Sequence, residues 1–123
     1  MKVERIDDES VRINGEAHSF GMEILEILEL RDRIIVLFEN YEWPDEDPNL
    51  GRNIFAYDAN GNELWRVQDA EVMIGGRTTE QDVSSGYTDL QLKDDGKIYA
   101  WAMDWRHELD PETGKISNPE YFR

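Results

Sequence analysis

The chain has 123 residues, which is the size of one domain able to bury about two-thirds of the surface that its unfolded form exposes. Its 13 basic and 28 acidic residues give a net charge of 13 − 28 = −15, and the absence of cysteine excludes disulfide frameworks, cysteine-ligated metals and cysteine nucleophiles. Because an acidic surface repels phosphate, we expect no nucleic acid and no membrane as partner, and a basic protein instead.

Targeting and membrane segments are not expected. The first residues, MKVERIDDESVRING, contain no apolar run of the signal-peptide kind, and no stretch approaches the roughly 18 apolar residues of a membrane helix. We therefore expect a cytoplasmic protein. Four Trp, five Tyr and four Phe supply material for a packed core.

The N-terminal segment predicts short strands. Alternating runs at 3–6 and 11–13 flank a charged turn at 7–10 and indicate a hairpin, and 16–20 has the pattern of a further short strand. Residues 22–30, MEILEILEL, fit a helix and a strand equally well by periodicity. We interpret them as the first strand of a hairpin, because 34–38, IIVLF, is β-branched and apolar on both faces, as in a central strand.

The middle of the chain contains a loop and a hairpin. Residues 39–51 hold two prolines, five carboxylates and no basic residue, which predicts a long loop. Residues 53–68 follow, with two alternating apolar runs that meet at the turn Ala59-Asn60-Gly61-Asn62, and this pattern predicts a hairpin.

The C-terminal part repeats this order after a Gly-, Ser- and Thr-rich connection at 69–86. Residues 87–93 alternate, which predicts that Thr88, Leu90 and Leu92 face inward, and 98–103, IYAWAM, is apolar on both faces and predicts a second central strand. A closing hairpin is expected around the turn at 110–114, with its last strand ended by Asn118-Pro119.

The two halves form an internal repeat. Strand, charged turn, apolar strand, bend, Asp-containing turn with Gly, and return strand occur twice, with Asp58 and Asp110 in equivalent places. We predict one all-β domain over 1–123: an antiparallel meander of about eight to ten strands in two packed sheets or two propeller-blade-like units, at 24–68 and 87–117, after an N-terminal hairpin and with little helix.

Two strings carry a family resemblance. AYDANGNELWRV at 56–67 and ELDPETGKI at 108–116 resemble the repeat segments of quinoprotein-type (PQQ-like) β-propellers. The resemblance implies blade-like hairpins in which Trp65 packs between neighbouring sheets. The chain has material for about two blades, whereas a propeller closes with at least four, and the cofactor- and calcium-binding residues of the quinoprotein enzymes are not found. We therefore expect no cofactor and no such activity.

Candidate catalytic and metal-binding residues have structural alternatives. Asp58, Asn60, Asn62 and Glu63 lack the spacing of a calcium loop, so a hairpin turn explains them better. His18 and His107 stand in no metal-binding pattern, and strand alternation places His107 away from Glu108 and alongside Leu109. The segments at 75–79 and 84–86 match neither a phosphate-binding loop nor a nucleophile motif. No enzyme and no metal site are predicted.

The acidic loop supplies the candidate binding site. It sets aromatic side chains among carboxylates, which suits a contact with a Lys- and Arg-rich surface, although the same aromatic rings are also explained by packing on the core. The predicted partner-binding residues are Tyr41, Trp43, Asp45, Glu46 and Asp47.

These observations favour a non-enzymatic, acidic protein-binding module. Small acidic proteins of this type are similar to bacterial immunity proteins, which cover the basic active site of a toxin or nuclease. Two alternatives remain from the sequence. One is a structural or regulatory homo-oligomer formed through exposed strand edges. The other is a small hydrolase or sugar-active enzyme that uses His107 or paired carboxylates.

Overall fold

The computed structural model describes residues 1–39, 51–68, 86–102 and 104–122, and within these residues it contains strands and no helix. The strands are β1 (Val3–Arg5), β2 (Ser10–Ile13), β3 (Glu16–Ser19), β4 (Ile24–Glu29), β5 (Arg33–Phe38), β6 (Ile54–Asp58), β7 (Glu63–Arg66), β8 (Asp89–Leu92), β9 (Ile98–Ala102), β10 (Trp105–Leu109) and β11 (Ile116–Tyr121). No helix in the described part is long and apolar enough to cross a membrane.

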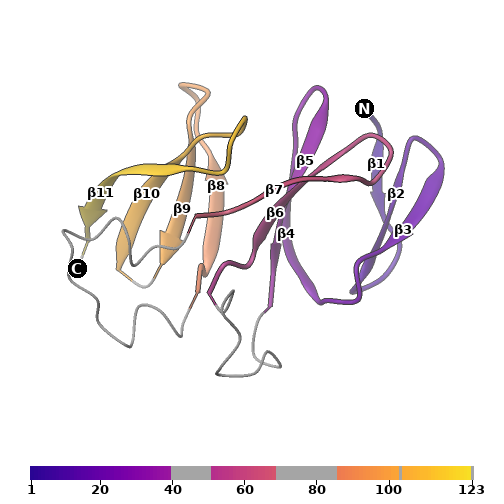
Figure 1. Ribbon diagram of the computed structural model, residues 1–123, viewed down its shortest axis with the longest axis horizontal. Coiled ribbons are helices and arrows are strands. Elements are labelled where there is room, and N and C mark those ends of the chain that lie inside the picture. Colours follow the sequence, from indigo (N-terminus) through magenta and orange to yellow (C-terminus); the bar gives the residue numbers. More distant parts are fainter. Residues whose placement is uncertain (40–50, 69–85, 103, 123) are drawn as a thin grey trace.

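The strands form three antiparallel sheets, and the prediction of an all-β, antiparallel fold is confirmed. The sheets have the orders β1-β2-β3, β4-β5-β6-β7 and β11-β10-β9-β8. They stand in a row, with β4–β7 in the middle and the two termini at opposite ends (Figure 1). The two four-stranded sheets are simple meanders, and the N-terminal strands form a sheet of their own.

The ambiguous stretch at 22–30 is a strand in the structure. β4 pairs with β5 from Ile24 opposite Phe38 to Glu29 opposite Ile34, with a bulge after Ile24. Only a strand at this place gives β5 a hydrogen-bonded neighbour on each side, because β6 pairs with the other edge of β5. Tertiary pairing therefore decides a segment whose periodicity permits both structures.

The inner strand β5 of the middle sheet is buried on both faces. In β5, Ile35 and Leu37 pack toward β8–β11, whereas Ile34, Val36 and Phe38 pack toward β1–β3. All five side chains are fully buried, which confirms the prediction of a central strand from IIVLF. Two apolar cores result, one between each pair of neighbouring sheets.

Both predicted Asp-containing turns are present. In the β6–β7 turn, the Oδ1 atom of Asp58 accepts hydrogen bonds from the backbone N–H of Asn60 (2.8 Å) and Asn62 (2.9 Å), and Gly61 has a φ of +81°. The backbone hydrogen bond from Asn62 holds the pKa of Asp58 below its usual value. The oxygens that resemble calcium ligands in the sequence thus close a hairpin, as the sequence indicates.

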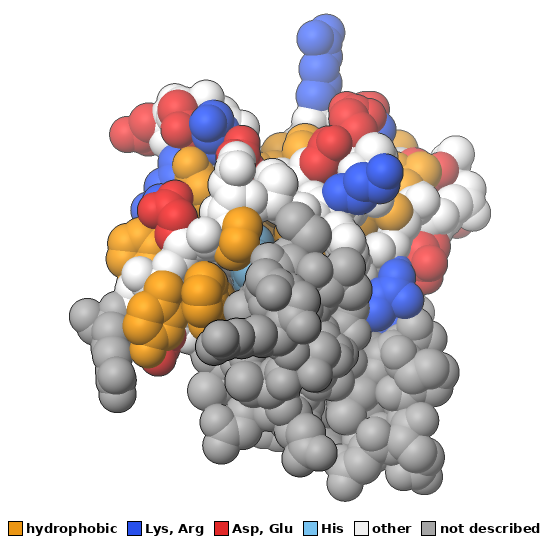
Figure 2. Space-filling model, turned by 60° about the vertical axis from the view of Figure 1, so that its left-hand side comes forward, with side chains coloured by type: hydrophobic (Ala, Val, Ile, Leu, Met, Phe, Trp, Pro, Cys, Tyr) orange, Lys and Arg blue, Asp and Glu red, His pale blue; other side chains and the backbone are white. Residues whose placement is uncertain are grey.

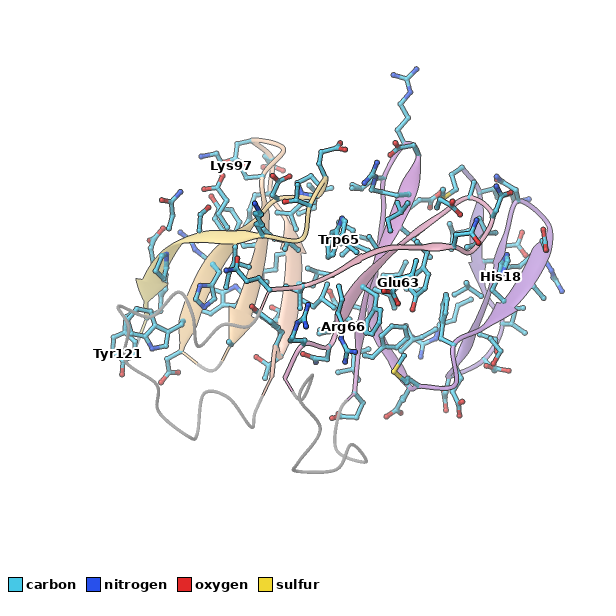
Figure 3. The ribbon with its side chains drawn as sticks, in the orientation of Figure 1. His18, Glu63, Trp65, Arg66, Lys97 and Tyr121 are labelled. Atoms are coloured by element: carbon cyan, nitrogen blue, oxygen red, sulfur yellow. The ribbon has the colours of Figure 1, made fainter. Side chains whose placement is uncertain are left out.

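Neighbouring sheets contact each other through a ring placed on a glycine. The ring of His18 in β3 lies over Gly61, and the ring of Trp65 in β7 lies over Gly114 in the β10–β11 turn, so a Cβ at either glycine would overlap the ring. Figure 3 shows His18 in the N-terminal sheet and Trp65 at the border with the C-terminal sheet. This is the packing of Trp65 between sheets that the propeller resemblance implies.

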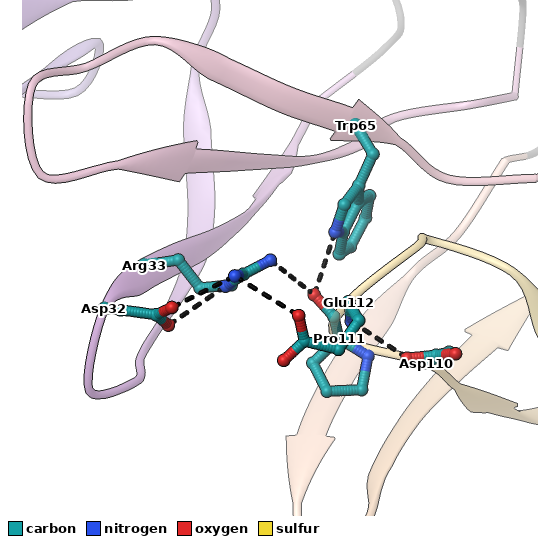
Figure 4. A network of polar contacts seen from close by, with 6 residues as sticks. All are labelled: Asp32, Arg33, Trp65, Asp110, Pro111 and Glu112. Atoms are coloured by element: carbon teal, nitrogen blue, oxygen red, sulfur yellow. Dashed lines mark hydrogen bonds and ion pairs between the residues drawn. The ribbon is translucent and has the colours of Figure 1, made fainter.

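A polar network reinforces the second of these contacts (Figure 4). The carbonyl oxygen of Pro111 accepts hydrogen bonds from Trp65 Nε1 (2.9 Å) and from Arg33 Nη1 (3.2 Å). Arg33 also pairs with Asp32 through two nitrogens and with Glu112 at 3.4 Å. Hydrogen bonding to Arg33 keeps the pKa of Asp32 below its usual value. The network ties β5 and β7 to the β10–β11 turn.

Two local predictions are wrong. The sequence predicts that Thr88, Leu90 and Leu92 all face inward, but only Leu90 is buried. Thr88 is exposed, and Leu92 is 48% exposed because it ends β8 at the rim of its sheet. Asn118-Pro119 does not end the last strand, since β11 continues to Tyr121. Asn118 takes a φ of +49° in a bulge, and β11 is an edge strand, where a proline without an N–H is tolerated.

Candidate functional site

The predicted binding loop lies outside the described residues. This applies to all five of its residues, Tyr41, Trp43, Asp45, Glu46 and Asp47, and to the segments at 75–79 and 84–85. The candidate site below is therefore built from the described strands.

The sheet β8–β11 stands at one end of the row, and β9 has one buried and one partly buried face. Ile98, Ala100 and Ala102 are buried against the middle sheet, whereas Tyr99 and Trp101 point the other way and are half-buried. The prediction of a second central strand from IYAWAM is confirmed, because β9 pairs with β8 on one side and β10 on the other, but the side chains of Tyr99 and Trp101 are only partly buried. The physical reason is that no fourth sheet follows in the part of the chain that is described (Figure 1).

We call the surface formed by the side chains that point away from the middle sheet the outward face. Strand registers arrange most of it in two rows across the four strands, in the order β8, β9, β10 and β11. The first row is Asp89, Trp101, Arg106 and Glu120, and the second row is Gln91, Tyr99, Glu108 and Ser117. Each row thus places an aromatic ring on the inner strand β9 and a carboxylate within one or two strands of it.

Aromatic rings and a guanidinium stack on the outward face. The Cζ atom of Arg106 lies 4.4 Å from the ring centroid of Tyr99 and 4.8 Å from that of Phe122, and the rings of Trp101 and Phe122 are 5.1 Å apart. Arg106 Nη2 pairs with Glu120 at 3.0 Å. Figure 2 shows this end of the molecule, where hydrophobic side chains reach the surface beside carboxylates. The rings of the outward face therefore pack against one another and against one guanidinium.

Carboxylates surround these rings. Glu108 lies next to Tyr99, with Lys97 at 3.7 Å and Asn118 donating a 2.8 Å hydrogen bond to its Oε2 atom. Asp89 is turned toward its own strand, where Oδ1 accepts from the N–H of Leu90. Burial raises the pKa of Glu26 on the neighbouring strand β4, and the charge of Asp89 raises it further.

A hollow of about 350 Å³ lies at the turn end of the outward face. It is lined by Gly96, Lys97, Ile98, Glu108, Leu109, Asp110, Pro111 and Ser117. Its lining combines the carboxylates of Glu108 and Asp110 and the hydroxyl of Ser117 with apolar side chains. The hollow leaves room for a side chain of another molecule beside the row that contains Tyr99.

His107 faces the core, as strand alternation predicts. Its side chain is fully buried, like that of Leu109, and its ring lies 6.3 Å from that of Tyr87. Neither ring nitrogen has a hydrogen-bond partner among the described residues, and burial lowers the pKa of His107 below its ordinary value. A substrate does not reach this imidazole without displacing core packing. Among the described residues, no three His, Asp or Glu side chains gather as a metal site would require.

The sequence reasoning missed the outward face. Its signal was present in 98–103, where Tyr99 and Trp101 alternate with small apolar residues on the inner strand of the last sheet. That pattern indicates a strand with packing partners on both faces. Only the number of sheets shows that one face has no covering element among the described residues.

A family model covers almost the whole chain. The match extends over residues 1–121 and is described as a domain of unknown function, DUF7957. The chain belongs to the DUF7957 family. The DUF7957 match identifies neither a propeller family nor an immunity-protein family. No curated protein matches the chain at a significant level.

Proposed function

We propose that this DUF7957 chain is a non-enzymatic, cytoplasmic protein-binding module that engages a basic protein partner through the outward face of β8–β11. The observation that carries the proposal is the partly buried aromatic face of β9, which no described element covers. A strand whose residues are apolar on both sides gains stability when both sides are covered, at about 25 cal/mol per Å² of apolar surface removed from water. A partner protein supplies that cover for Tyr99 and Trp101.

Charge supports a basic partner over other classes. The chain carries a net charge of −15, and its outward face holds three carboxylates against the guanidinium of Arg106 and the ammonium of Lys97, 2 − 3 = −1. Such a surface accelerates encounter with a positively charged protein and repels nucleic acid. Aromatic side chains set in a polar rim are the usual anchors of such interfaces.

The finer form of the proposal is an immunity or inhibitor protein that covers the basic active site of a toxin or nuclease. The acidic loop with Tyr41, Trp43, Asp45, Glu46 and Asp47 then forms a second contact. Co-expression tests this form, because the chain should protect cells from a toxic protein encoded beside its gene and a Tyr99→Ser, Trp101→Ser variant should not.

Affinity capture tests the proposal itself. Immobilised wild-type chain and a Tyr99→Ser, Trp101→Ser variant are exposed to lysate of the source organism, and a retained protein is purified and titrated by calorimetry. We expect a basic protein whose affinity falls with salt and is lost in the variant. A Leu25→Ser, Leu64→Ser variant, which changes exposed apolar residues of the middle sheet, is the matched control. Equal binding by all three chains contradicts the proposal.

A further inference from the structure

We infer that the outward face binds an arginine or lysine side chain of the partner, stacked on the rings of Trp101 and Tyr99 and neutralised by Asp89 and Glu108. The inference rests on the proposed function and adds the chemistry of the contact. It identifies the partner's contact segment as cationic, where the proposed function requires only that the partner is basic overall.

The rings already hold one cation. Arg106 stacks between Tyr99 and Phe122 at 4.4 Å and 4.8 Å, distances at which a guanidinium is attracted by the electron-rich ring face. Trp101 is the strongest ring of the set for such a contact. Its Nε1 atom donates a 3.3 Å hydrogen bond to Gln91, which fixes the orientation of the ring, and the ring of Phe122 lies 5.1 Å from it.

The neighbouring carboxylates stand in suitable places. Asp89 is directly opposite Trp101 on β8, and Glu108 is directly opposite Tyr99 on β10, so the Cβ atoms of each pair lie about 5 Å apart across the sheet. Arg106 is already neutralised by Glu120 at 3.0 Å. Glu108 already pairs with Lys97 at 3.7 Å, and Asp89 accepts hydrogen bonds from Leu90 and Gln91 within β8, so an incoming cation shares these two carboxylates with their present partners. The hollow beside Glu108 gives room for the side chain of that cation.

Charge argues against a second copy of the chain as the occupant. Two copies would bring a net charge of −15 each together, and their outward faces are both negative. Like-charged faces cost free energy on association. A cationic segment of another protein turns this repulsion into attraction.

Nuclear magnetic resonance with a defined probe tests the inference. The ¹⁵N-labelled chain is titrated with an acetylated peptide Gly-Arg-Gly-Arg-Gly amide and with its uncharged citrulline analogue, and the indole N–H signal of Trp101 is assigned from a Trp101→Phe variant. We expect this signal to shift with the arginine peptide and not with the citrulline peptide. Trp101→Leu should weaken binding about tenfold, and Asp89→Asn with Glu108→Gln should weaken it by about three- to tenfold.

The control variant makes the same change in net charge at a place far from the outward face. Asp8→Asn with Glu16→Gln removes two exposed carboxylates from the N-terminal sheet region, and it should bind the peptide like the wild type. Equal loss in both double variants overturns the inference, since it means unspecific attraction to an acidic protein. If a partner is captured through Tyr99 and Trp101 but the arginine peptide leaves Trp101 unmoved, the inference fails while the proposed function stands. If the peptide binds and no partner is captured, the proposed function fails instead.

Discussion

The imidazole of His107 is a buried polar group whose two nitrogens have no hydrogen-bond partner in the described part of the chain, and such a group destabilises a fold when it becomes charged. Burial lowers its pKa below the ordinary value of 6.5. Between the folded and the unfolded pKa values the unfolded chain binds more protons. Stability attributable to His107 is therefore present above pH 6.5 and decreases as the pH falls toward the folded pKa, by up to about 1.4 kcal/mol per pH unit.

A His107→Leu variant should lose this sensitivity. We expect the drop in the free energy of unfolding between pH 7.5 and pH 5.5, measured by urea titration, to be larger in the wild type than in the variant. Carboxylates titrate alike in both chains, so the difference between the two drops isolates the imidazole. Equal drops would mean that His107 remains neutral in the unfolded state or finds a partner when protonated.

Gly114 is a second residue whose role is measurable. It combines a φ of +77° with a position where a Cβ would lie 2.5 Å from Trp65 Cε3. Gly96 has a similar φ of +83° and open space around it. Gly114→Ala should therefore destabilise the chain by about 2 kcal/mol more than Gly96→Ala, because only the first adds overpacking to backbone strain. Thermal unfolding of the two variants compares them, and equal losses would show that the Trp65 contact adapts.

Local residue patterns explain which of these features the sequence predicts. Asp58 and Gly61 specify their turn through bonds within five residues, and alternation alone places His107 on the inward face. The exposure of Leu92 and Trp101 depends on where a neighbouring sheet ends, which no local pattern contains. Local residue patterns therefore predict the turns and which side chains share a strand face, but they do not predict whether a neighbouring sheet covers that face.

At the scale of elements, β11 shows how an edge strand avoids pairing with other molecules. Pro119 removes a backbone donor, Asn118 bends the strand at a φ of +49°, and its side chain bonds to Glu108 at 2.8 Å. Bulges and prolines on edges hinder association with further strands.

An Asn118→Thr, Pro119→Val variant should straighten this edge. We expect it to self-associate with increasing concentration, as measured by size-exclusion chromatography with light scattering, while the wild type does so less. A Ser117→Thr variant changes the same strand without restoring a donor and serves as control. A wild type that is already a stable oligomer through this edge would contradict the expectation and favour the homo-oligomer alternative.

Element identity was predictable where pairing partners follow closely in the chain. The hairpins β4–β5, β6–β7 and β10–β11 each join strands through short turns, and their turn residues reveal them. The periodicity of 22–30 does not distinguish a helix from a strand, because the strand β4 is determined by its pairing with β5. The length of β11 was missed because a proline usually indicates the end of a strand, and only its place at the edge of the sheet permits it.

For the whole molecule, charge is the property with the widest effect. Fifteen net negative charges repel one another in the folded state, and salt screens this repulsion with a Debye length of about 10 Å at 0.1 M. Raising NaCl from about 10 mM to about 0.3 M should therefore raise the melting temperature by a few degrees.

An Asp8→Lys, Asp94→Lys variant carries −15 + 4 = −11, and both positions are exposed. We expect its melting temperature to be higher at low salt and to depend less on NaCl, as followed by differential scanning calorimetry. If NaCl raises the melting temperature of both chains by the same amount, the salt effect comes from ion hydration and not from repulsion between the negative charges of the chain.

The number and order of the sheets are the least predictable features at this scale. Strands of three or four residues at the N-terminus have the pattern of a hairpin, and they form a sheet only because Val11 and Ile13 complete the core against Phe38 and Phe55. The acidic character of the surface, by contrast, follows directly from composition.

The row of sheets also gives the molecule two unlike ends with one terminus at each (Figure 1). The C-terminus emerges beside the outward face, since Phe122 belongs to its ring stack, whereas the N-terminus lies at the far sheet. A fluorescent protein or surface tether fused at residue 1 leaves the aromatic end open to solution, and the same fusion at the other terminus stands in the way. Reporter fusions of this protein are therefore best attached at the N-terminus.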